Sequence, residues 1–250
     1  MRLKDKIAIV TGGASGFGKG IVEKFIQQGA KVVIADINME LAESVAKEFG
    51  SDTIAVKVDV SNKEEVDNLM KETLNNFSKI DILVQNAAIG MKPQDLVDTS
   101  EELFDKLFAI NVKSVFLGAK AIIPIFKKQG KGGVILNTIS TAALRPRPGL
   151  TIYNSTKGAL IPMTKALALE VADSKIRVNG LCPVAGETPM LKEFLGDSDQ
   201  AEAHKKFISS VPLGRLAMPS DLANAALYLC SDEADFITGI MLEIDGGRSI

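Results

Sequence analysis

Tyr153 and Lys157 are the residues whose types and spacing most directly indicate chemistry. They stand four positions apart, so a helix places both side chains on one face. A phenol with its ordinary pKa of about 10 is a poor base at neutral pH, and an ammonium group one turn away should lower that pKa by favouring the phenolate. The pair is therefore a candidate for exchanging a proton with a substrate oxygen, although an ordinary helix-surface pair has the same spacing.

A glycine-rich turn follows the first apolar run, Ile7–Val10, and reads TGGASGFG from residue 11 to residue 18. Glycines in such a turn let the backbone approach a pyrophosphate, and the next helix offers free N–H groups and a positive dipole end. The spacing is Gly-x-x-x-Gly-x-Gly, not Gly-x-Gly-x-x-Gly, so a purely structural turn is the alternative. The candidate nucleotide contacts are Gly12, Ser15, Gly16, Phe17 and Gly18.

Asp36 ends the second apolar run, 18 residues after Gly18. A carboxylate at this strand end binds both hydroxyls of an adenosine ribose and repels a 2′-phosphate, which selects NAD over NADP. Ile37 follows it, and no arginine stands where a 2′-phosphate would need one. We therefore expect NAD as the cofactor, with Asp36 and Ile37 among its contacts; a loop aspartate without that role is the alternative.

The composition excludes several other chemistries. His204 is the only histidine, so a Ser-His-Asp triad or a multi-histidine metal site would depend on it alone, and no metal is expected. Cys182 and Cys230 lack metal-ligand spacing and indicate a reducing compartment. A formal net charge of −2 gives no basic field for nucleic acid. No signal-peptide pattern and no apolar window of about 18 residues is found, so we expect a cytoplasmic protein without a membrane partner.

Short apolar runs alternate with longer amphipathic stretches along the chain. The predicted helices include 17–28, 40–49 and 63–76, and the predicted strands are 7–11, 31–36, 53–58, 80–85, 133–139, 177–181 and 241–244. This alternation predicts a parallel, doubly wound α/β sheet with helices on both faces. No repeat or linker divides the chain, so residues 1–250 are predicted to form a single domain, with a helical substrate lid at about 186–212.

Taken with Ser140, thirteen residues upstream, the segment YNSTK at 153–157 resembles the short-chain dehydrogenase/reductase family. The resemblance covers essentially the whole chain and includes five motifs in the family's order. It implies a Rossmann fold whose seven-stranded parallel sheet has the order 3-2-1-4-5-6-7, and a homotetramer. The matching residues beyond the glycine turn are Asp59-Val60, Asn86-Ala87, Asn111, Ser140, Tyr153 and Lys157.

The resemblance also implies the role of each catalytic candidate. Tyr153 exchanges the proton, Ser140 binds the substrate oxygen, Lys157 binds the nicotinamide ribose, and Asn111 holds a water that links Lys157 to solvent. Further cofactor contacts implied in this way are Asp59 and Val60 at the adenine, Asn86 and Ala87 after the fourth strand, and Pro183, Val184 and Thr188.

Two segments depart from the family pattern. The chain reads QNAA at 85–88 where members usually read NNAG, so Ala88 adds a methyl group beside the cofactor, whereas Gln85 is expected only to repack the strand end. The chain also reads PVAGET at 183–188 after the sixth strand, where Pro-Gly is usual. Val184 and Thr188 are nevertheless expected to contact the nicotinamide.

The segment between Ser140 and Tyr153 should border the substrate. It contains Arg145 and Arg147, each followed by a proline, and a pair of guanidinium groups can bind a carboxylate, sulfonate or phosphate bidentately. Solvated loop charges or subunit contacts are the alternative. Met190, in the predicted lid, is expected to make the pocket apolar.

These features predict an NAD-dependent enzyme that interconverts a small secondary alcohol, such as a hydroxy acid or polyol, and its ketone. A 3-oxoacyl-carrier-protein reductase is the alternative, because the whole chain is also similar to those enzymes; they more often use NADPH, so Asp36 counts against it. A nicotinamide-binding regulatory protein without turnover is a third possibility. The intact set of Ser140, Tyr153 and Lys157 argues against that one, since a sensor needs no proton-transfer group.

Overall fold

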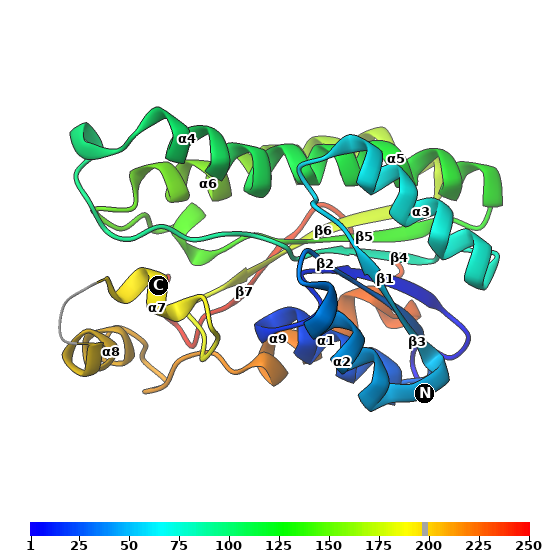
Figure 1. Cartoon of the computed structure of the whole chain (residues 1–250), viewed down its shortest axis with the longest axis horizontal. Helices are drawn as coiled ribbons and strands as arrows, with labels where there is room; N and C mark the ends of the chain where they lie inside the picture. The colour runs from blue at the N-terminus through cyan, green and yellow to red at the C-terminus, as the bar shows by residue number, and fades with distance from the viewer. Residues whose placement is uncertain (197–199) are drawn as a thin grey trace.

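Within the residues that the structure describes, 1–196 and 200–250, seven parallel strands form one sheet in the order β3-β2-β1-β4-β5-β6-β7. The structure is a computed structural model, and the sheet order is the one expected. The strands are buried between two layers of helices (Figure 1), which explains why their sequences are nearly continuous apolar runs. Their bounds are β1 Ile7–Thr11, β2 Lys31–Asp36, β3 Thr53–Lys57, β4 Ile82–Gln85, β5 Gly133–Thr138, β6 Ile176–Pro183 and β7 Met241–Ile244.

Helices cover both faces of the sheet, as Figure 1 shows. One layer contains α1 (Gly16–Gln27), α2 (Met39–Phe49) and α9 (Pro219–Cys230). The other contains α3 (Lys63–Phe77), α4 (Glu101–Phe108), α5 (Ser114–Gln129) and α6 (Thr151–Glu170). The helices α7 (Leu191–Leu195) and α8 (Gln200–Ser209) belong to neither layer and lie beyond the end of the sheet.

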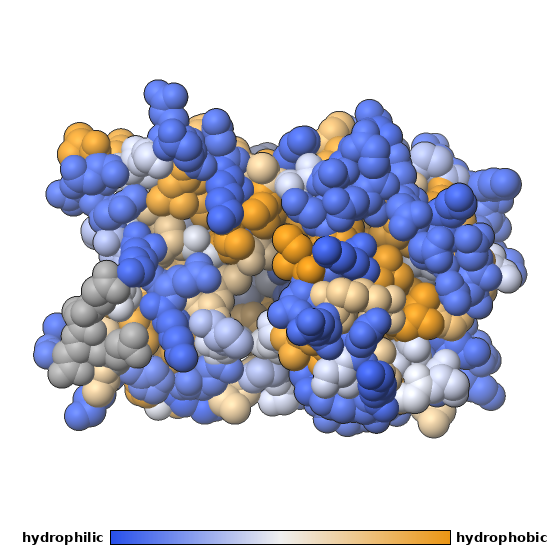
Figure 2. All heavy atoms as spheres, in the orientation of Figure 1, coloured by the Kyte–Doolittle hydropathy of each residue, from blue (hydrophilic) through white to orange (hydrophobic). Residues whose placement is uncertain are grey.

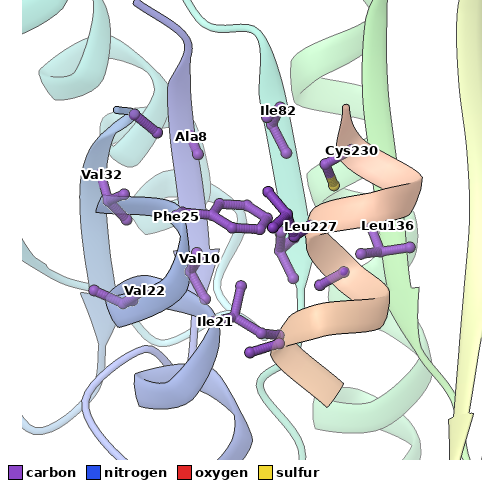
Figure 3. Packing of buried hydrophobic residues seen from close by; sticks show 14 of the residues in the cluster. Ala8, Val10, Ile21, Val22, Phe25, Val32, Ile82, Leu136, Leu227 and Cys230 are labelled. Atoms are coloured by element: carbon purple, nitrogen blue, oxygen red, sulfur yellow. The ribbon is translucent and has the colours of Figure 1, made fainter. Parts of the chain in front are cut away.

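The apolar core lies on each side of the sheet, between the strands and one helix layer. In Figure 3, Phe25 of α1 and Leu227 of α9 pack together over Val10 and Ile82, which lie on the neighbouring strands β1 and β4. All four side chains are nearly or fully buried. This packing holds α1 against the sheet, and α1 begins at Gly16, after the turn that follows β1.

Five strand boundaries differ from those predicted, and the start of β4 and the end of β6 differ by two residues each. Strand β4 begins at Ile82, not at residue 80, because the side-chain amide of Gln129 binds both the N–H and the carbonyl of Ile80, at 3.0 and 2.7 Å. Strand β6 extends to Pro183, since it still pairs with β7 there, with Pro183 opposite Ile244. A proline can end a strand without the loss of a sheet hydrogen bond when no neighbouring strand requires its missing N–H.

The segment Glu101–Gln129 is helical throughout and has the length and apolar composition of a membrane span. The expectation that no window approaches such a span was therefore wrong on composition. A core helix of a globular fold passes the same test, and here Leu117, Ile122 and Phe126 of α5 are buried against the sheet. A π-helical turn, Ala109–Lys113, separates α4 from α5 and carries Asn111.

The segment predicted as a lid has a small core of its own. Leu191 and Leu195 of α7 pack with Phe207 of α8 and with Val184 and Leu216. Phe17, from the glycine turn, packs against this cluster as well as against the main core. Residues 197–199 of the predicted lid lie outside the described residues.

Candidate active site

A cavity of about 460 Å³ lies at the carboxyl ends of the central strands. Figure 2 shows the face of Figure 1 hollowed near its centre. Nearly every residue singled out from the sequence lines the cavity: Gly12, Ser15, Gly16, Phe17, Asp36, Ile37, Asp59, Val60, Asn86, Ala87, Ser140, Arg145, Arg147, Tyr153, Lys157, Pro183, Val184, Thr188 and Met190. Gly18 and Asn111 are the two that do not line it, and each supports a neighbour instead.

The glycine turn is a cradle that side chains would fill. Gly12 and Gly16 have φ angles of +62° and +51°, which favour glycine. A Cβ on Gly12 would lie 3.0 Å from the Cα of Ala87, and one on Gly18 would lie 1.9 Å from the carbonyl oxygen of Gly12. These glycines leave backbone N–H groups and the N-terminus of α1 facing the cavity, which fits the pyrophosphate of a dinucleotide.

Asn86, the residue after β4, binds this turn with its side chain. Its side-chain amide donates to the carbonyl oxygens of Thr11 and Gly12, at 3.1 and 3.3 Å. Its side-chain oxygen accepts a hydrogen bond from the hydroxyl of Thr138 at 3.3 Å. Asn86 thus connects the ends of β1, β4 and β5, and its main role in the structure is to hold the turn in shape.

Asp36 is half-buried at the end of β2 and also supports the turn. Its Oδ2 accepts a hydrogen bond of 3.1 Å from the N–H of Ala14, and its Oδ1 accepts one of 3.0 Å from the N–H of Asn38. Each carboxylate oxygen has a second lone pair available for a ligand. The side chain lines the cavity, so its position fits the two hydroxyls of a ribose.

Asp59 and Val60 follow β3 and line the same end of the cavity as Asp36. The Asp59 carboxylate accepts hydrogen bonds from the N–H and the hydroxyl of Ser61, at 2.9 and 2.7 Å. These hydrogen bonds hold the loop in which Val60 presents an apolar side chain to the cavity. Ile37, by contrast, is 65% exposed at the rim.

Ser140, Tyr153 and Lys157 meet at the other end of the cavity. Ser140 follows β5, while Tyr153 and Lys157 lie on the first turns of α6. The Lys157 ammonium lies 6.0 Å from the centre of the Tyr153 ring and donates a hydrogen bond of 3.0 Å to the carbonyl of Thr138. The N–H of Ala142 donates to Ser140 Oγ at 3.1 Å, which leaves the hydroxyl proton of Ser140 free for another acceptor.

Burial controls the acid–base properties of this group. It raises the pKa of Tyr153 to about 12, an effect that a hydrogen bond with Ser140 partly offsets and the charge of Glu193 reinforces. In the protein itself, burial therefore outweighs the lowering of the Tyr153 pKa that the ammonium group of Lys157 is expected to cause. Burial also lowers the pKa of Lys157 to about 8, because taking an ammonium ion out of water disfavours its charged form.

Asn111 lies beside the catalytic group, not in the cavity. It is 1% exposed in the π-helical turn, and its amide donates to the carbonyl of Ile89 at 3.0 Å and to the hydroxyl of Thr156 at 3.2 Å. Its side-chain oxygen accepts from the N–H of Ile89 at 2.9 Å. Because both amide protons are used in this way, the side chain cannot donate to a water. A water of the expected relay would have to donate to the second lone pair of its oxygen or bind its backbone.

Gln85 does more than repack the end of β4, which was the expectation for it. Its amide nitrogen donates to the side chain of Asn137 at 3.1 Å, and Asn137 in turn donates to the hydroxyl of Thr164 at 2.9 Å. All three side chains are buried. This network connects β4, β5 and α6 beneath the catalytic group and so helps to hold α6 in register with the sheet.

The helix α7 closes the cavity over Tyr153. The ring of Phe194 meets that of Tyr153 edge-on, with 5.0 Å between centroids, and Glu193 accepts a hydrogen bond of 2.9 Å from the N–H of Gly90. The methyl group of Thr188 lies beside Gly16, where a Cβ on that glycine would be 3.2 Å from the Thr188 Cβ. The lid segment therefore contacts both the catalytic group and the glycine turn.

Two charged residues that line the cavity were not anticipated. Arg248 belongs to the C-terminal segment after β7, and Lys106 lies on α4, one turn before the π-helical segment. Nothing in the pattern around Arg248, which follows two glycines, marks it as a site residue. Lys106 stands four residues before Ile110, and a helix places residues at this spacing on one face. That spacing is the sequence signal that could have identified Lys106.

Comparisons with known proteins agree with this arrangement. A family model described as Enoyl-(Acyl carrier protein) reductase matches residues 12–249. The chain is 40% identical to 4-formylbenzenesulfonate dehydrogenase TsaC1/TsaC2 of Comamonas testosteroni over an alignment of 253 positions that covers all of both chains. It is 35% identical to the 3-oxoacyl-[acyl-carrier-protein] reductase FabG of Thermotoga maritima, again over the full length of both.

A solved structure is also similar. It is described as 3-ketoacyl-(acyl-carrier-protein) reductase from Brucella melitensis complexed with NADH. It shares 49% sequence identity with this chain and superposes with a TM-score of 0.95, covering 99% of this chain and all of that one.

Proposed function

Because the chain belongs to the short-chain dehydrogenase/reductase family, we propose that it is an NAD-dependent oxidoreductase that interconverts a secondary alcohol and its ketone. One observation carries the proposal. The glycine turn with Asp36 and the group of Ser140, Tyr153 and Lys157 line opposite ends of the same cavity. A dinucleotide held by the first end would therefore have its reactive end near the second.

The fit of the glycine turn supports a nicotinamide dinucleotide, which when bound accepts a hydride from an alcohol or donates one to a ketone. Tyr153 takes the proton from the alcohol at its phenolic oxygen, or returns it to the ketone oxygen. Ser140 donates its free hydroxyl proton to the substrate oxygen, where negative charge develops. Lys157, fixed on Thr138, supplies positive charge behind the phenol.

Asp36 supports NAD over NADP, because its carboxylate would repel the 2′-phosphate of NADP. The carboxylate is held in position, since it accepts hydrogen bonds from the N–H groups of Ala14 and Asn38. The charge of the oxidised nicotinamide would add to that of Lys157 in favouring the phenolate. That contribution opposes the effect of burial, which raises the Tyr153 pKa to about 12.

A 3-oxoacyl-carrier-protein reductase remains the second candidate, and one observation favours it. The solved structure that is 49% identical bears that description and is complexed with NADH, so a preference for NADH does not by itself count against this activity. The 40% identical relative is instead named for 4-formylbenzenesulfonate, which supports a small free substrate. Substrate tests, not cofactor tests, must separate the two.

A homotetramer is part of the proposal. Exposed apolar side chains support it: Leu169 at the end of α6 is 81% exposed and Phe236 is fully exposed, whereas such residues are usually covered. Light scattering coupled to gel filtration would report the mass of the assembly against the 26.7 kDa of one chain.

The test of the proposed function is a turnover assay with NADH and with NADPH on neutral ketones, keto acids and acetoacetyl thioesters. Activity on small ketones with NADH supports the first candidate, and activity confined to thioesters supports the second. Tyr153→Phe should bind NADH normally, measured by fluorescence, and lose about 100-fold or more in kcat. If the wild-type protein bound NADH and reduced none of these substrates, the regulatory alternative would replace both.

A further inference from the structure

Three arginines from two distant parts of the chain meet at the substrate end of the cavity. Arg145 and Arg147 belong to the loop between Ser140 and α6, and Arg248 comes from the C-terminal segment. All three line the cavity together with Tyr153. The pair expected from the sequence, Arg145 and Arg147, is thus part of a group that the fold completes with a third cation.

No carboxylate pairs directly with this group. In the part of the chain that the structure describes, none of the three guanidinium groups forms an ion pair with a carboxylate. Burial and the charge of Arg248 lower the pKa of Arg147. Burial and the charge of Arg145 lower that of Arg248, and the nearby charge of Asp245 only partly opposes this. Like charges held half-buried and close together destabilise a fold, and an anion between them would remove that cost.

Arg147 is held in a geometry that leaves its hydrogen-bond donors available. Its guanidinium lies over the ring of Phe207, 3.9 Å from the ring centre, which fixes the plane of the group. The side chain donates no hydrogen bond to any described residue, so the N–H groups at its edge remain unused. A guanidinium edge with paired donors matches the two oxygens of an oxyacid anion.

The backbone around these arginines is tied to the catalytic helix. The carbonyl of Arg147 accepts a hydrogen bond of 2.8 Å from the side chain of Asn154, the residue after Tyr153. The guanidinium of Arg145 donates to the carbonyl of Arg248, and Asp245 accepts hydrogen bonds from the N–H groups of Gly247 and Ser249 at 2.9 and 2.7 Å. The distance between the arginines and the phenol is therefore set before any substrate arrives.

We propose that Arg147 and Arg248 form an anion subsite that binds the negatively charged group of the substrate while its carbonyl or hydroxyl lies at Tyr153 and Ser140. Arg145 is a positioning residue, since it holds the segment that carries Arg248. The substrate class is then a small ketone or secondary alcohol that bears a carboxylate, sulfonate or phosphate. This inference rests on the proposed function and narrows it.

The apolar part of the cavity wall agrees with such a substrate. Phe194, which contacts the ring of Tyr153, and Leu150 line the same cavity, so the substrate also meets apolar groups there. A polyol would leave its hydroxyl groups unpaired there, which costs free energy. A short hydrocarbon connector between ketone and anion meets no such penalty.

The first experiment compares ketones on one frame, CH3–CO–CH2–CH2–X. The acids are 4-oxopentanoate, 3-oxobutane-1-sulfonate and 3-oxobutyl phosphate, and the neutral reference is methyl 4-oxopentanoate. The wild-type kcat/KM should favour at least one acid over the ester by about 10- to 100-fold, the range of a charge-assisted pair. The preferred acid identifies which anion the subsite takes. A ratio near one for all three acids would overturn the subsite and leave the proposed function standing.

Variants then locate the preference. In Arg147→Met and in Arg248→Met, the ratio of kcat/KM for acid over ester should fall to near one, and Arg147→Lys should recover only part of it because a lysine cannot bind bidentately. Arg215→Met is the matched control, since Arg215 pairs with Asp221 at 2.9 Å and does not line the cavity. An unchanged ratio in the Arg147 and Arg248 variants would assign the preference elsewhere and contradict the proposal.

A binding measurement separates this inference from the function on which it rests. Calorimetric titration of the wild-type protein with pentanoate and with pentanamide, with NADH present and without it, should show tighter binding of the anion by about tenfold or more. The Arg147→Met protein should lose the difference. Tighter anion binding without turnover of any ketone would retain the subsite and refute the proposed function. Equal binding of both probes would refute the subsite whatever the turnover.

Discussion

The Nζ atom of Lys157 donates a hydrogen bond of 3.0 Å to the carbonyl oxygen of Thr138, the last residue of β5. This contact ties the helix that carries Tyr153 to the strand end that precedes Ser140. The phenol, the hydroxyl and the ammonium are therefore held by one backbone framework. Their geometry depends on the register of α6 against β5, which the buried side chains of Asn137 and Thr164 also fix at 2.9 Å.

Substitution of Ser140 should move the pH dependence of alcohol oxidation to higher pH. In the proposed mechanism, oxidation requires the Tyr153 phenolate. Its rate should therefore rise as pH approaches the phenol pKa, which burial raises to about 12 and the hydrogen bond with Ser140 lowers. Ser140→Ala removes the lowering contribution, so a higher pH is needed to form the same fraction of phenolate. Profiles of kcat/KM against pH for a secondary alcohol measure the shift, and a displacement to lower pH would contradict this assignment.

Asp36→Asn should separate the two tasks of the Asp36 side chain. The amide keeps an oxygen that accepts from the N–H of Ala14 but loses the charge that repels a 2′-phosphate. We expect the ratio of kcat/KM for NADH over NADPH to fall by about tenfold or more, since one charge contact is lost, while thermal stability changes little. Asp59→Asn is the control, because its carboxylate binds Ser61 and should leave the ratio unaltered.

Gly18→Ala should damage the fold and the cofactor site together. The added Cβ would lie 1.9 Å from the carbonyl oxygen of Gly12, so the turn must deform, at a cost of about 3 kcal/mol in the free energy of unfolding. Gly158→Ala on α6 is the matched control. No atom lies within 4 Å of its added Cβ, and alanine should stabilise the helix by about 0.5–1 kcal/mol. Urea unfolding with and without NADH tests both, and equal effects would contradict the packing described.

Neither cysteine should react with a thiol reagent in the native protein. Burial raises the pKa of Cys182 to about 11 and that of Cys230 to about 12, so the thiolate is scarce at neutral pH. Titration with a chromogenic disulfide should detect both thiols only after denaturation. Rapid modification of Cys182 in the folded protein, with loss of activity, would show that the Ser140 end of the cavity opens more than the structure indicates.

The parts of the site that follow directly from strand ends could be predicted from the sequence. Periodicity and β-branched runs located the strands, and a parallel sheet places the residues after each strand at one edge. That reasoning places the glycine turn with Gly12 and the carboxylate of Asp36 at one edge of the sheet. Helical spacing places Tyr153 and Lys157 on one face, whereas Ser140 and the catalytic role of the pair were predicted from the family resemblance.

What could not be predicted depends on contacts between distant segments. Arg248 reaches the cavity because the segment after β7 turns back through two positive-φ glycines, Gly246 and Gly247, and no local pattern encodes where that segment ends. The rise of the Tyr153 pKa in the protein itself could not be predicted, because the burial that causes it depends on α7 and Phe194, which pack on the phenol from forty residues away. The start of β4 at Ile82, and not at residue 80, likewise depends on the distant side chain of Gln129.

Arg248 follows β7, the last strand of the sheet, and this order has a consequence for how the protein is made. A ribosome releases the strands β1 to β6 and the helix α6 before it adds the segment after β7. The dinucleotide cradle and the phenol can therefore assemble before the guanidinium of Arg248 is in place. Selectivity for the substrate would be the last of these properties that the protein acquires during synthesis.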